Sequence, residues 1–492
     1  MGRYGVVVVG GGNAGMSAAL AARELGRRVL LLERAPYAER GGNTAFTGGL
    51  FRFAYEDSSV IRQLVPDLSD DEIARTDFGS YPADSFFDDM ARVTEHRSDP
   101  DLVELLVNGS QAAVRWLRRK GVRFVPSYGR QAYQVDGRFT FWGGLTLEAS
   151  GGGAGLVEHL ESACSAAGVE IGYGARAREL VVRDGRVRGV RFERERLLHD
   201  VECDAVVLAA GGFQANAAWR TRYLGPGWDL AKVRGTRYDT GDGIAMALAI
   251  GASPAGNWSG CHAVAWELNA PEFGDLAVGD SYQKHSYPLG IVVNQHGRRF
   301  IDEGADFRNY TYAKYGAEIL RQPGQMAWQV FDHKVLGLLR DEYSIRQVTR
   351  VRAGSLAELA KRMEGLEQET FLRTVAEFNA AVTDDRPFQP NTRDGRCTTG
   401  LAVDKSNWAQ RLDTPPYEAY AVTCGITFTF GGLRVNQRAQ VLDDGGDPIP
   451  GLSAAGELVG GLFYFNYPGG SGLAAGTVFG RVAGTSAARI DD

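Results

Sequence analysis

The glycines at the start of the chain have the spacing of a dinucleotide-binding turn. Gly10, Gly12 and Gly15 follow the apolar run 6–9 and lead into a helical pattern that extends to Leu25. Glycines at this spacing let the backbone approach a pyrophosphate, which then lies at the N-terminus of the following helix. Glu33 ends the next apolar run and is placed to accept hydrogen bonds from an adenosine ribose. The pattern predicts a dinucleotide site and disfavours NADP, because an acidic residue would repel its 2′-phosphate.

Further glycine-containing loops are spread along the chain. They follow the apolar run 205–208, span residues 240–243, and recur at 456–457 and 469–473 near the C-terminus. Each loop taken alone is more typical of a plain turn. Their joint order suits a long, extended cofactor that touches both ends of the chain, and we therefore predict FAD rather than NAD.

Composition narrows the class of protein. The chain has 492 residues, too many for one compact core, with 44% hydrophobic and 23% charged residues, as in a soluble globular protein. The net charge of −6 argues against nucleic-acid binding, and no apolar stretch approaches the length of a membrane span. Five widely separated cysteines without a CxxC pair argue against iron–sulfur ligation and against disulfides. We expect a cytoplasmic protein without a metal site.

The order of apolar runs predicts two domains. Strands at 6–9, 29–32 and 205–208 alternate with helical patterns, and the glycines at 151–153 predict a turn before a helix that begins near residue 156. From about residue 253 to about 420 aromatic residues and histidine become dense and the alternation loosens. The end of the chain returns to glycine loops and a helix. We predict one domain made of residues 1–252 and 421–492, with residues 253–420 inserted as a second domain.

The motifs resemble the fumarate reductase/succinate dehydrogenase flavoprotein superfamily over essentially the whole chain. The similarity rests on the motifs at 10–15, 33, 41–44, 240–243, 297–303 and 455–472. Within the superfamily, the stretches 258–264, 306–310 and 465–471 look most like tricarballylate dehydrogenases, which desaturate a tricarboxylate. The resemblance implies an α/β fold: a Rossmann-type FAD-binding domain built from both chain ends, with an inserted α+β domain that caps the flavin.

The resemblance also implies which residues hold the cofactor. In covalent members a histidine in the loop corresponding to 40–46 is bonded to the flavin, and this loop has none, so we expect dissociable FAD. The expected cofactor-binding residues are Gly10, Gly12, Asn13, Ala14, Gly15, Glu33, Arg34, Gly42, Asn43, Thr44, Thr47, Gly48, Gly49, Ala177, Ala210, Gly211, Asp242, Gly456, Glu457, Gly470, Ser471, Gly472 and Leu473.

Three residues are candidates for the catalytic chemistry. Desaturation beside a carboxylate sends a hydride to flavin N5 and removes a proton from the neighbouring carbon, so cationic or hydrogen-bonding groups must stabilise the developing charge. The resemblance places His262 where the family has a substrate-binding histidine, and Arg308 close to its proton-donating arginine. Tyr467 is the third candidate. A guanidinium is a poor base, and Asp306, Tyr310 and Tyr312 are near enough in sequence to form a relay, so the proton acceptor stays open.

These residues are compatible with more than one function. The leading hypothesis is an FAD-dependent dehydrogenase of a small polycarboxylate, which passes electrons to oxygen, a quinone or a redox protein. The segment 467–469 also resembles 3-oxosteroid Δ1-dehydrogenases. A fumarate reductase is a third candidate, and a non-enzymatic flavin-binding electron-transfer protein is a fourth. Similar fumarate reductases have an arginine at the position of Tyr467 and a histidine shortly before Gly431. Neither cation is present here, which favours dehydrogenation over fumarate reduction.

Overall fold

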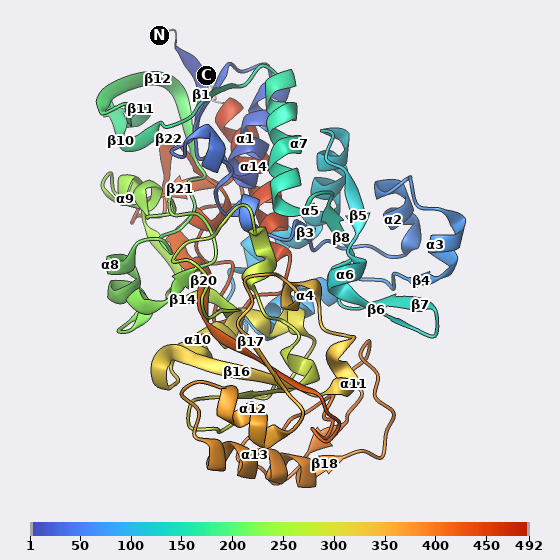
Figure 1. Cartoon of the computed structure of the whole chain (residues 1–492). Helices are drawn as coiled ribbons and strands as arrows, with labels where there is room; N and C mark the ends of the chain where they lie inside the picture. The colour runs from blue at the N-terminus through green and yellow to red at the C-terminus, as the bar shows by residue number, and fades with distance from the viewer. Residues whose placement is uncertain (1–2, 490–492) are drawn as a thin grey trace.

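A parallel sheet forms the upper part of the molecule in the computed structural model, which describes residues 3–489 (Figure 1). Its strands lie in the order β9 (Glu170–Gly172), β2 (Val29–Leu32), β1 (Tyr4–Val9), β12 (Leu197–Leu208) and β22 (Pro448–Ala454), each parallel to the next. Val9 pairs with both Leu32 and Leu208, so three carboxyl ends share one edge of the sheet. Such an edge is where open α/β sheets bind ligands.

Both ends of the chain contribute to this sheet. β1 comes from the N-terminus and β22 from the C-terminus, while β10 (Arg176–Arg183) and β11 (Arg186–Arg194) extend the sheet beyond β12 as an antiparallel hairpin. β21 (Gln440–Leu442) pairs with β22. The predicted α/β fold with a Rossmann-type sheet built from both ends is confirmed.

Two helices from opposite ends of the chain pack backbone against backbone beside the sheet. α14 (Ser471–Ala488) has glycines at 476, 480 and 484, one per turn, and they face α1 (Asn13–Glu24). A Cβ at Gly480 would lie 2.5 Å from the carbonyl oxygen of Ala14, and one at Gly484 2.1 Å from that of Ala18. Only glycine permits this approach. Both helices begin at the carboxyl edge of the sheet.

The second sheet lies lower in Figure 1 and is centred on one long strand. β20 (Tyr417–Leu433) pairs with β13 (Lys232–Val233), β14 (Pro254–Glu267), β16 (Met326–Phe331) and β17 (Arg350–Ala353), and β15 (Ile291–Val293) pairs with β16. Every residue of β20 is buried except Phe428, which is partly exposed. β13 and most of β20 (421–433) lie outside residues 253–420, so this sheet extends past the predicted insert, and the domain boundaries stay a prediction.

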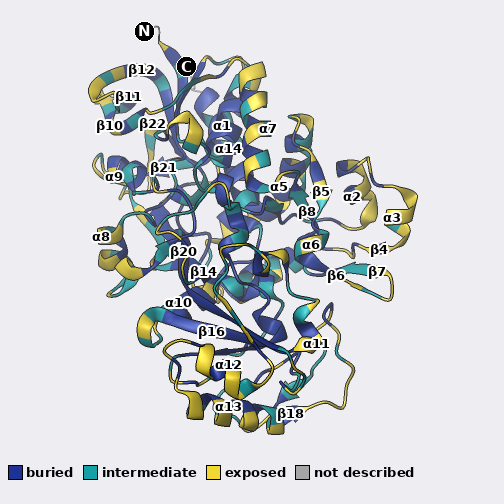
Figure 2. Cartoon of the chain, in the orientation of Figure 1, coloured by how far each residue is buried: buried dark blue, intermediate teal, exposed yellow. Residues whose placement is uncertain are grey.

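Shorter elements surround the two sheets. Exposed residues concentrate on their outer faces, as on α12 and α13 at the bottom of Figure 2. The remaining helices are α2 (Ser58–Leu64), α3 (Asp70–Ala74), α4 (Ala83–Val93), α5 (Pro100–Arg119), α6 (Tyr128–Gln131), α7 (Gly152–Ala166), α8 (Ala217–Trp219), α9 (Asp242–Leu248), α10 (Tyr312–Leu320), α11 (His333–Leu336), α12 (Leu356–Arg362) and α13 (Gln368–Ala381). The remaining strands are β3 (Leu50–Phe51), β4 (Thr76–Asp77), β5 (Phe124–Pro126), β6 (Ala132–Val135), β7 (Arg138–Phe141), β8 (Leu147–Ala149), β18 (Val382–Thr383) and β19 (Cys397–Thr398). Among residues 3–489, no helix has the length and apolar character needed to cross a bilayer.

The glycines at 151–153 behave differently from the predicted turn. α7 begins at Gly152, about four residues earlier than expected, and Gly151 precedes it in the left-handed conformation with φ +80°. The amide of Gly153 donates to the carbonyl of Thr47 at 2.9 Å, and a Cβ there would lie 2.0 Å from the carbonyl oxygen of Thr44. These glycines therefore bring the first turn of a helix against the loop at 42–47.

The contact between α1 and α14 can be tested with Gly484→Ala. Alanine normally stabilises a helix interior relative to glycine by up to about 1 kcal/mol, whereas here its Cβ would collide with the Ala18 carbonyl. We expect a net loss of about 1–3 kcal/mol and a lower melting temperature. Gly337→Ala is the matched control, because its added Cβ meets no atom within 4 Å and its φ is −71°. Equal melting temperatures for the two variants would contradict the backbone contact.

Candidate functional site

One long cavity extends from the carboxyl edge of the parallel sheet to β20. All of the predicted cofactor-binding residues line it except Gly15, Gly49 and Ser471, and so do the three predicted catalytic residues. Gly15 instead packs against the Gly10 carbonyl, Gly49 against the backbone of Gly152, and Ser471 is the first residue of α14. The structure thus brings the predicted residues together, while their individual roles stay predictions.

The N-termini of α1 and α14 form one part of the cavity wall. Neither helix has an acidic residue in its first turn. The Asn13 side chain links them, since Nδ2 donates to the Leu473 carbonyl at 2.8 Å and Oδ1 accepts from Thr477 Oγ1 at 3.0 Å. Two helix N-termini directed at one cavity supply unpaired amides and positive dipole ends. This donor set suits the pyrophosphate of a dinucleotide.

Glu33 is held rigidly at the end of β2. Its Oε2 accepts from the Gly11 amide at 2.7 Å, and its Oε1 accepts from the Ala35 amide at 2.7 Å. Burial raises the pKa of this carboxyl group, and the two amide hydrogen bonds oppose the rise. Each oxygen keeps a second lone pair, so Glu33 can still accept from a ribose hydroxyl.

Arg34 and Asp242 form an ion-pair cluster next to Glu33 in the cavity wall. Asp242 accepts from Arg176 at 2.7 and 3.1 Å, and Arg34 lies 3.3 Å from the same carboxylate. Burial acts against ionisation of Asp242, but the hydrogen bond from Arg176 and the charge of Arg34 outweigh it and lower its pKa. Asp242 therefore stays ionised beside these two guanidinium groups.

Hydrogen bonds hold both terminal nitrogens of the Arg308 guanidinium group. It lies in a short 3-10 turn after Phe307, where Nη1 donates to Nδ1 of His285 at 3.2 Å and Nη2 donates to the Arg130 carbonyl. Since a guanidinium only donates, Nδ1 of His285 accepts, and Nε2 carries the hydrogen of the neutral ring. Burial, followed by the charge of Arg308, places the His285 pKa well below its ordinary value. His285 is thus a neutral donor toward the cavity that it lines.

His262 lies in an aromatic box. Its ring stacks on Phe428 with centroids 5.1 Å apart, and the rings of Tyr312 and Tyr467 meet it edge-on at 4.9 Å. Burial, with the charge of Arg234 second, lowers its pKa well below the usual value. Neither ring nitrogen has a hydrogen-bond partner among residues 3–489, although both are buried. A buried, unsatisfied imidazole that lines a cavity is poised for a ligand.

Tyr467 presents a hydroxyl group whose oxygen is already satisfied. It accepts from the Tyr312 hydroxyl at 3.0 Å and from the Gly470 amide at 3.0 Å, directly before α14. Its own hydrogen is therefore available to a ligand. The Phe428 ring packs against the Tyr467 ring with centroids 5.3 Å apart. Phe428 lies in the region where the fumarate reductases that this chain resembles have a histidine.

The proposed relay residues separate in the structure. Tyr312 lines the cavity, as described above. Tyr310 instead donates to Asp89 at 2.6 Å, and Asp306 pairs with Arg92 at 2.7 Å. Neither Tyr310 nor Asp306 lines the cavity, so the suggestion that they form a relay there is not supported by their positions.

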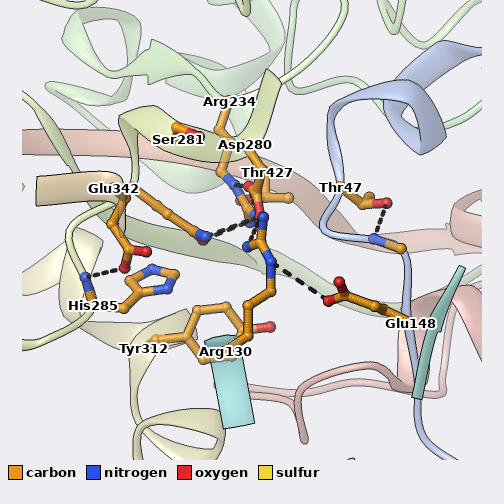
Figure 3. A network of polar contacts seen from close by, with 12 residues as sticks. Thr47, Arg130, Glu148, Arg234, Asp280, Ser281, His285, Tyr312, Glu342 and Thr427 are labelled. Atoms are coloured by element: carbon orange, nitrogen blue, oxygen red, sulfur yellow. Dashed lines mark hydrogen bonds and ion pairs between the residues drawn. The ribbon is translucent and has the colours of Figure 1, made fainter. Parts of the chain in front are cut away.

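Sequence reasoning missed a polar turn in the cavity wall. The segment 279–285 carries Asp280, Lys284 and His285. Asp280 bridges Arg130 of α6 and Arg234, which follows β13 (Figure 3). Lys284 fixes the turn by donating to the carbonyls of Ser281 and Glu342 at 3.2 and 2.8 Å. Burial lowers the Lys284 pKa to about 8. No glycine motif marks these residues, because only long-range packing assembles them.

Comparisons with known proteins show the family of the chain. The family model described as the FAD binding domain matches residues 5–473. The chain belongs to this family. It is 28% identical over 487 residues to a probable fumarate reductase of Shewanella frigidimarina, covering 98% of this chain and 74% of that protein. It is also 26% identical over 566 residues to a 3-oxosteroid 1-dehydrogenase of Mycolicibacterium smegmatis, covering 98% of this chain and 96% of that protein.

A solved structure extends the similarity to three dimensions. The open conformation of a flavocytochrome c3 fumarate reductase superposes with a TM-score of 0.72 at 27% identity, covering 99% of this chain and 78% of that one. The chain is therefore an FAD-dependent oxidoreductase that acts on CH–CH bonds. These relatives are fumarate reductases and a 3-oxosteroid dehydrogenase, not tricarballylate dehydrogenases, so the finer resemblance to the latter stays a prediction.

Glu148 of β8 provides a pH-dependent test of the cavity. Its carboxylate lies 3.6 Å from Arg130 Nε, and burial raises its pKa to about 7 despite that charge. When folding raises the pKa of a group, the resulting stabilisation is complete below the pKa of the unfolded state. It is lost as the pH rises through the pKa of the folded state. We expect the free energy of unfolding of Glu148→Gln, relative to that of the wild type, to increase from pH 5 to pH 8 by up to about 3 kcal/mol. Melting temperatures of both proteins at the two pH values check this, and parallel changes would contradict it.

Proposed function

We propose that this chain desaturates a carbon–carbon bond beside a carboxylate in a small di- or tricarboxylate. The supporting observation is the charge of the cavity wall around Arg308: Arg130, Arg234 and Arg308 line this part, Asp280 lies between the first two, and Glu148 lies 3.6 Å from Arg130. An excess of buried guanidinium charge is costly unless an anion completes it. A steroid would have no use for this charge, so the arginines favour a carboxylate substrate over a 3-oxosteroid.

The residues around the reacting carbons have separable tasks in this proposal. Bound FAD supplies the hydride acceptor at N5. Arg308, held by His285 and the Arg130 carbonyl, clamps the carboxylate next to the reacting bond and stabilises the charge that develops on it. His262 and Tyr467 offer neutral hydrogen-bond partners, and the Phe428 ring packs against both of their rings.

Dehydrogenation is the proposed direction. Tyr467 is an uncharged donor, and the stretch 427–430 consists of two threonines and two phenylalanines, so neither place carries a cation. Two fewer cations weaken the grip on a compact dianion that must be twisted for hydride attack. A hydroxyl donor and a wider aromatic wall suit a larger acid such as a tricarboxylate.

We also propose that FAD is held without a covalent bond, because the loop 40–46 has no histidine. The protein should purify yellow, and acid precipitation should leave FAD rather than FMN in the supernatant. Thin-layer chromatography or fluorescence before and after phosphodiesterase treatment identifies the flavin. Flavin that stays with the precipitate would contradict non-covalent binding.

The function is tested by anaerobic flavin bleaching. Tricarballylate or a related polycarboxylate should reduce the flavin of the holoprotein, whereas a 3-oxosteroid should not. After dithionite reduction, fumarate should reoxidise the flavin more slowly than tricarballylate reduces it. Bleaching by the steroid alone, or rapid turnover of fumarate with no response to larger acids, would overturn the proposal.

The matched variant for this experiment is Arg308→Lys. Lysine keeps the charge but loses the planar fork of donors, so bleaching by the polycarboxylate should slow by roughly a hundredfold or more while FAD content stays normal. An unchanged rate at full flavin occupancy would show that Arg308 does not contact the substrate.

A further inference from the structure

Asp280 joins two guanidinium groups from distant parts of the chain. Its Oδ2 accepts from Arg130 Nη1 at 2.9 Å, and its Oδ1 accepts from Arg234 through both Nη2 and, at 3.0 Å, Nε (Figure 3). All three residues line the cavity. Glu148 is a second carboxylate, 3.6 Å from Arg130 Nε. The guanidinium groups of Arg130, Arg234 and Arg308 thus share two carboxylates, Asp280 and Glu148, so this region of the protein retains positive charge.

The two arginines differ in how many of their hydrogen-bond donors already have a partner. Arg234 is 8% exposed, and it donates to Thr427 Oγ1 at 3.2 Å as well as to Asp280. Arg130 is 28% exposed, with one hydrogen bond to Asp280 and a looser 3.6 Å ion pair to Glu148 through Nε. Its Nη2 has no hydrogen-bond partner among residues 3–489. Arg130 therefore keeps donor groups without a partner, and its side chain is part of the cavity wall.

The position of Arg130 is fixed independently of any ligand. A Cβ at Gly48 would lie 3.0 Å from Arg130 Nη1, so the guanidinium rests against the loop backbone. Its own carbonyl accepts from Arg308 Nη2. Arg130 thus stands next to Arg308 but directs a separate guanidinium group at the cavity.

We propose that Arg130, positioned by Asp280 and Arg234, forms a second anion subsite that binds a substrate carboxylate remote from the reacting bond. The inference rests on the proposed function and deepens it, because it requires a substrate with at least two carboxylates. Arg308 holds the carboxylate beside the reacting carbons, and Arg130 holds the other one with its planar fork of donors. Arg234 is a positioning residue that acts through Asp280.

The experiment compares Arg130→Gln with wild-type holoprotein, using tricarballylate as the probe. Stopped-flow flavin reduction gives a half-saturating concentration and a limiting rate. We expect the half-saturating concentration to rise at least tenfold while the limiting rate changes less than threefold, because the lost contact is remote from the reacting carbons. Thermal unfolding is the second readout: at the same concentration, tricarballylate should raise the melting temperature of the wild type by more than that of the variant.

Arg130→Lys keeps the inference falsifiable if the glutamine variant folds poorly. It retains the charge that balances Asp280, but a single ammonium replaces the fork, so we expect at least a threefold rise in the half-saturating concentration. Arg191→Gln removes two exposed ion pairs on β11, with Glu179 and Asp200, and should change neither readout because Arg191 does not line the cavity.

The possible results distinguish a failure of the proposed subsite from a failure of the proposed function. A wild type that neither bleaches with polycarboxylates nor gains melting temperature from tricarballylate overturns the proposed function. A wild type that responds, with both Arg130 variants unchanged in half-saturating concentration, overturns the subsite alone. A fall in limiting rate at constant half-saturation also overturns it, because Arg130 would then act on the reaction rather than on binding.

Discussion

The backbone contact between α1 and α14 is the constraint on which the site depends. Glycines at every fourth position of α14 allow it to lie against α1, and the Asn13 side chain joins the first turns of the two helices. Because the helices come from opposite ends of the chain, the cavity wall is complete only when the C-terminal segment has docked. Two amide-rich helix ends then lie at the carboxyl edge of the sheet, where a long anionic cofactor finds donors in two places.

Charge distribution divides the cavity into two chemical regions. Around Glu33 and Asp242 the wall carries carboxylates that backbone amides or arginines already hold. Around Arg308 the wall is cationic, and burial keeps the imidazole groups of His262 and His285 neutral, since a further charge beside the arginines would be costly. The imidazole rings consequently serve as hydrogen-bonding surfaces, and the arginines carry the charge that selects an anion.

The sequence predicts the parts of this site that neighbouring residues build, but not the parts that form only when distant segments of the chain pack together. The turn at Gly10–Gly15 and the acid at Glu33 were predictable because both belong to one continuous strand–turn–helix–strand unit, residues 4–33. His262 and Arg308 were found through family motifs. Arg130 and Asp280 were missed because they meet only after α6 packs against the segment 279–285, which no local pattern encodes. Tyr310 shows the converse error: it is close to Arg308 in sequence, yet its hydroxyl group bonds Asp89.

Arg308 depends on a segment that belongs to neither sheet. The carbonyl oxygen that orients its Nη2 is that of Arg130, at the end of α6. That segment is in turn tied to the elements around the second sheet: Arg340 Nη1 donates to the Ala132 carbonyl at 2.8 Å, and the Asn391 side chain bonds both the amide and the carbonyl of Tyr133 at 2.9 and 2.8 Å. Arg340 also lies 3.7 Å above the Tyr133 ring. Any movement that separates segment 128–133 from these partners withdraws the Arg130 guanidinium and loosens Arg308 at the same time. Binding of a polycarboxylate across both arginines would therefore favour the docked arrangement, because only there do the two guanidinium groups face one cavity.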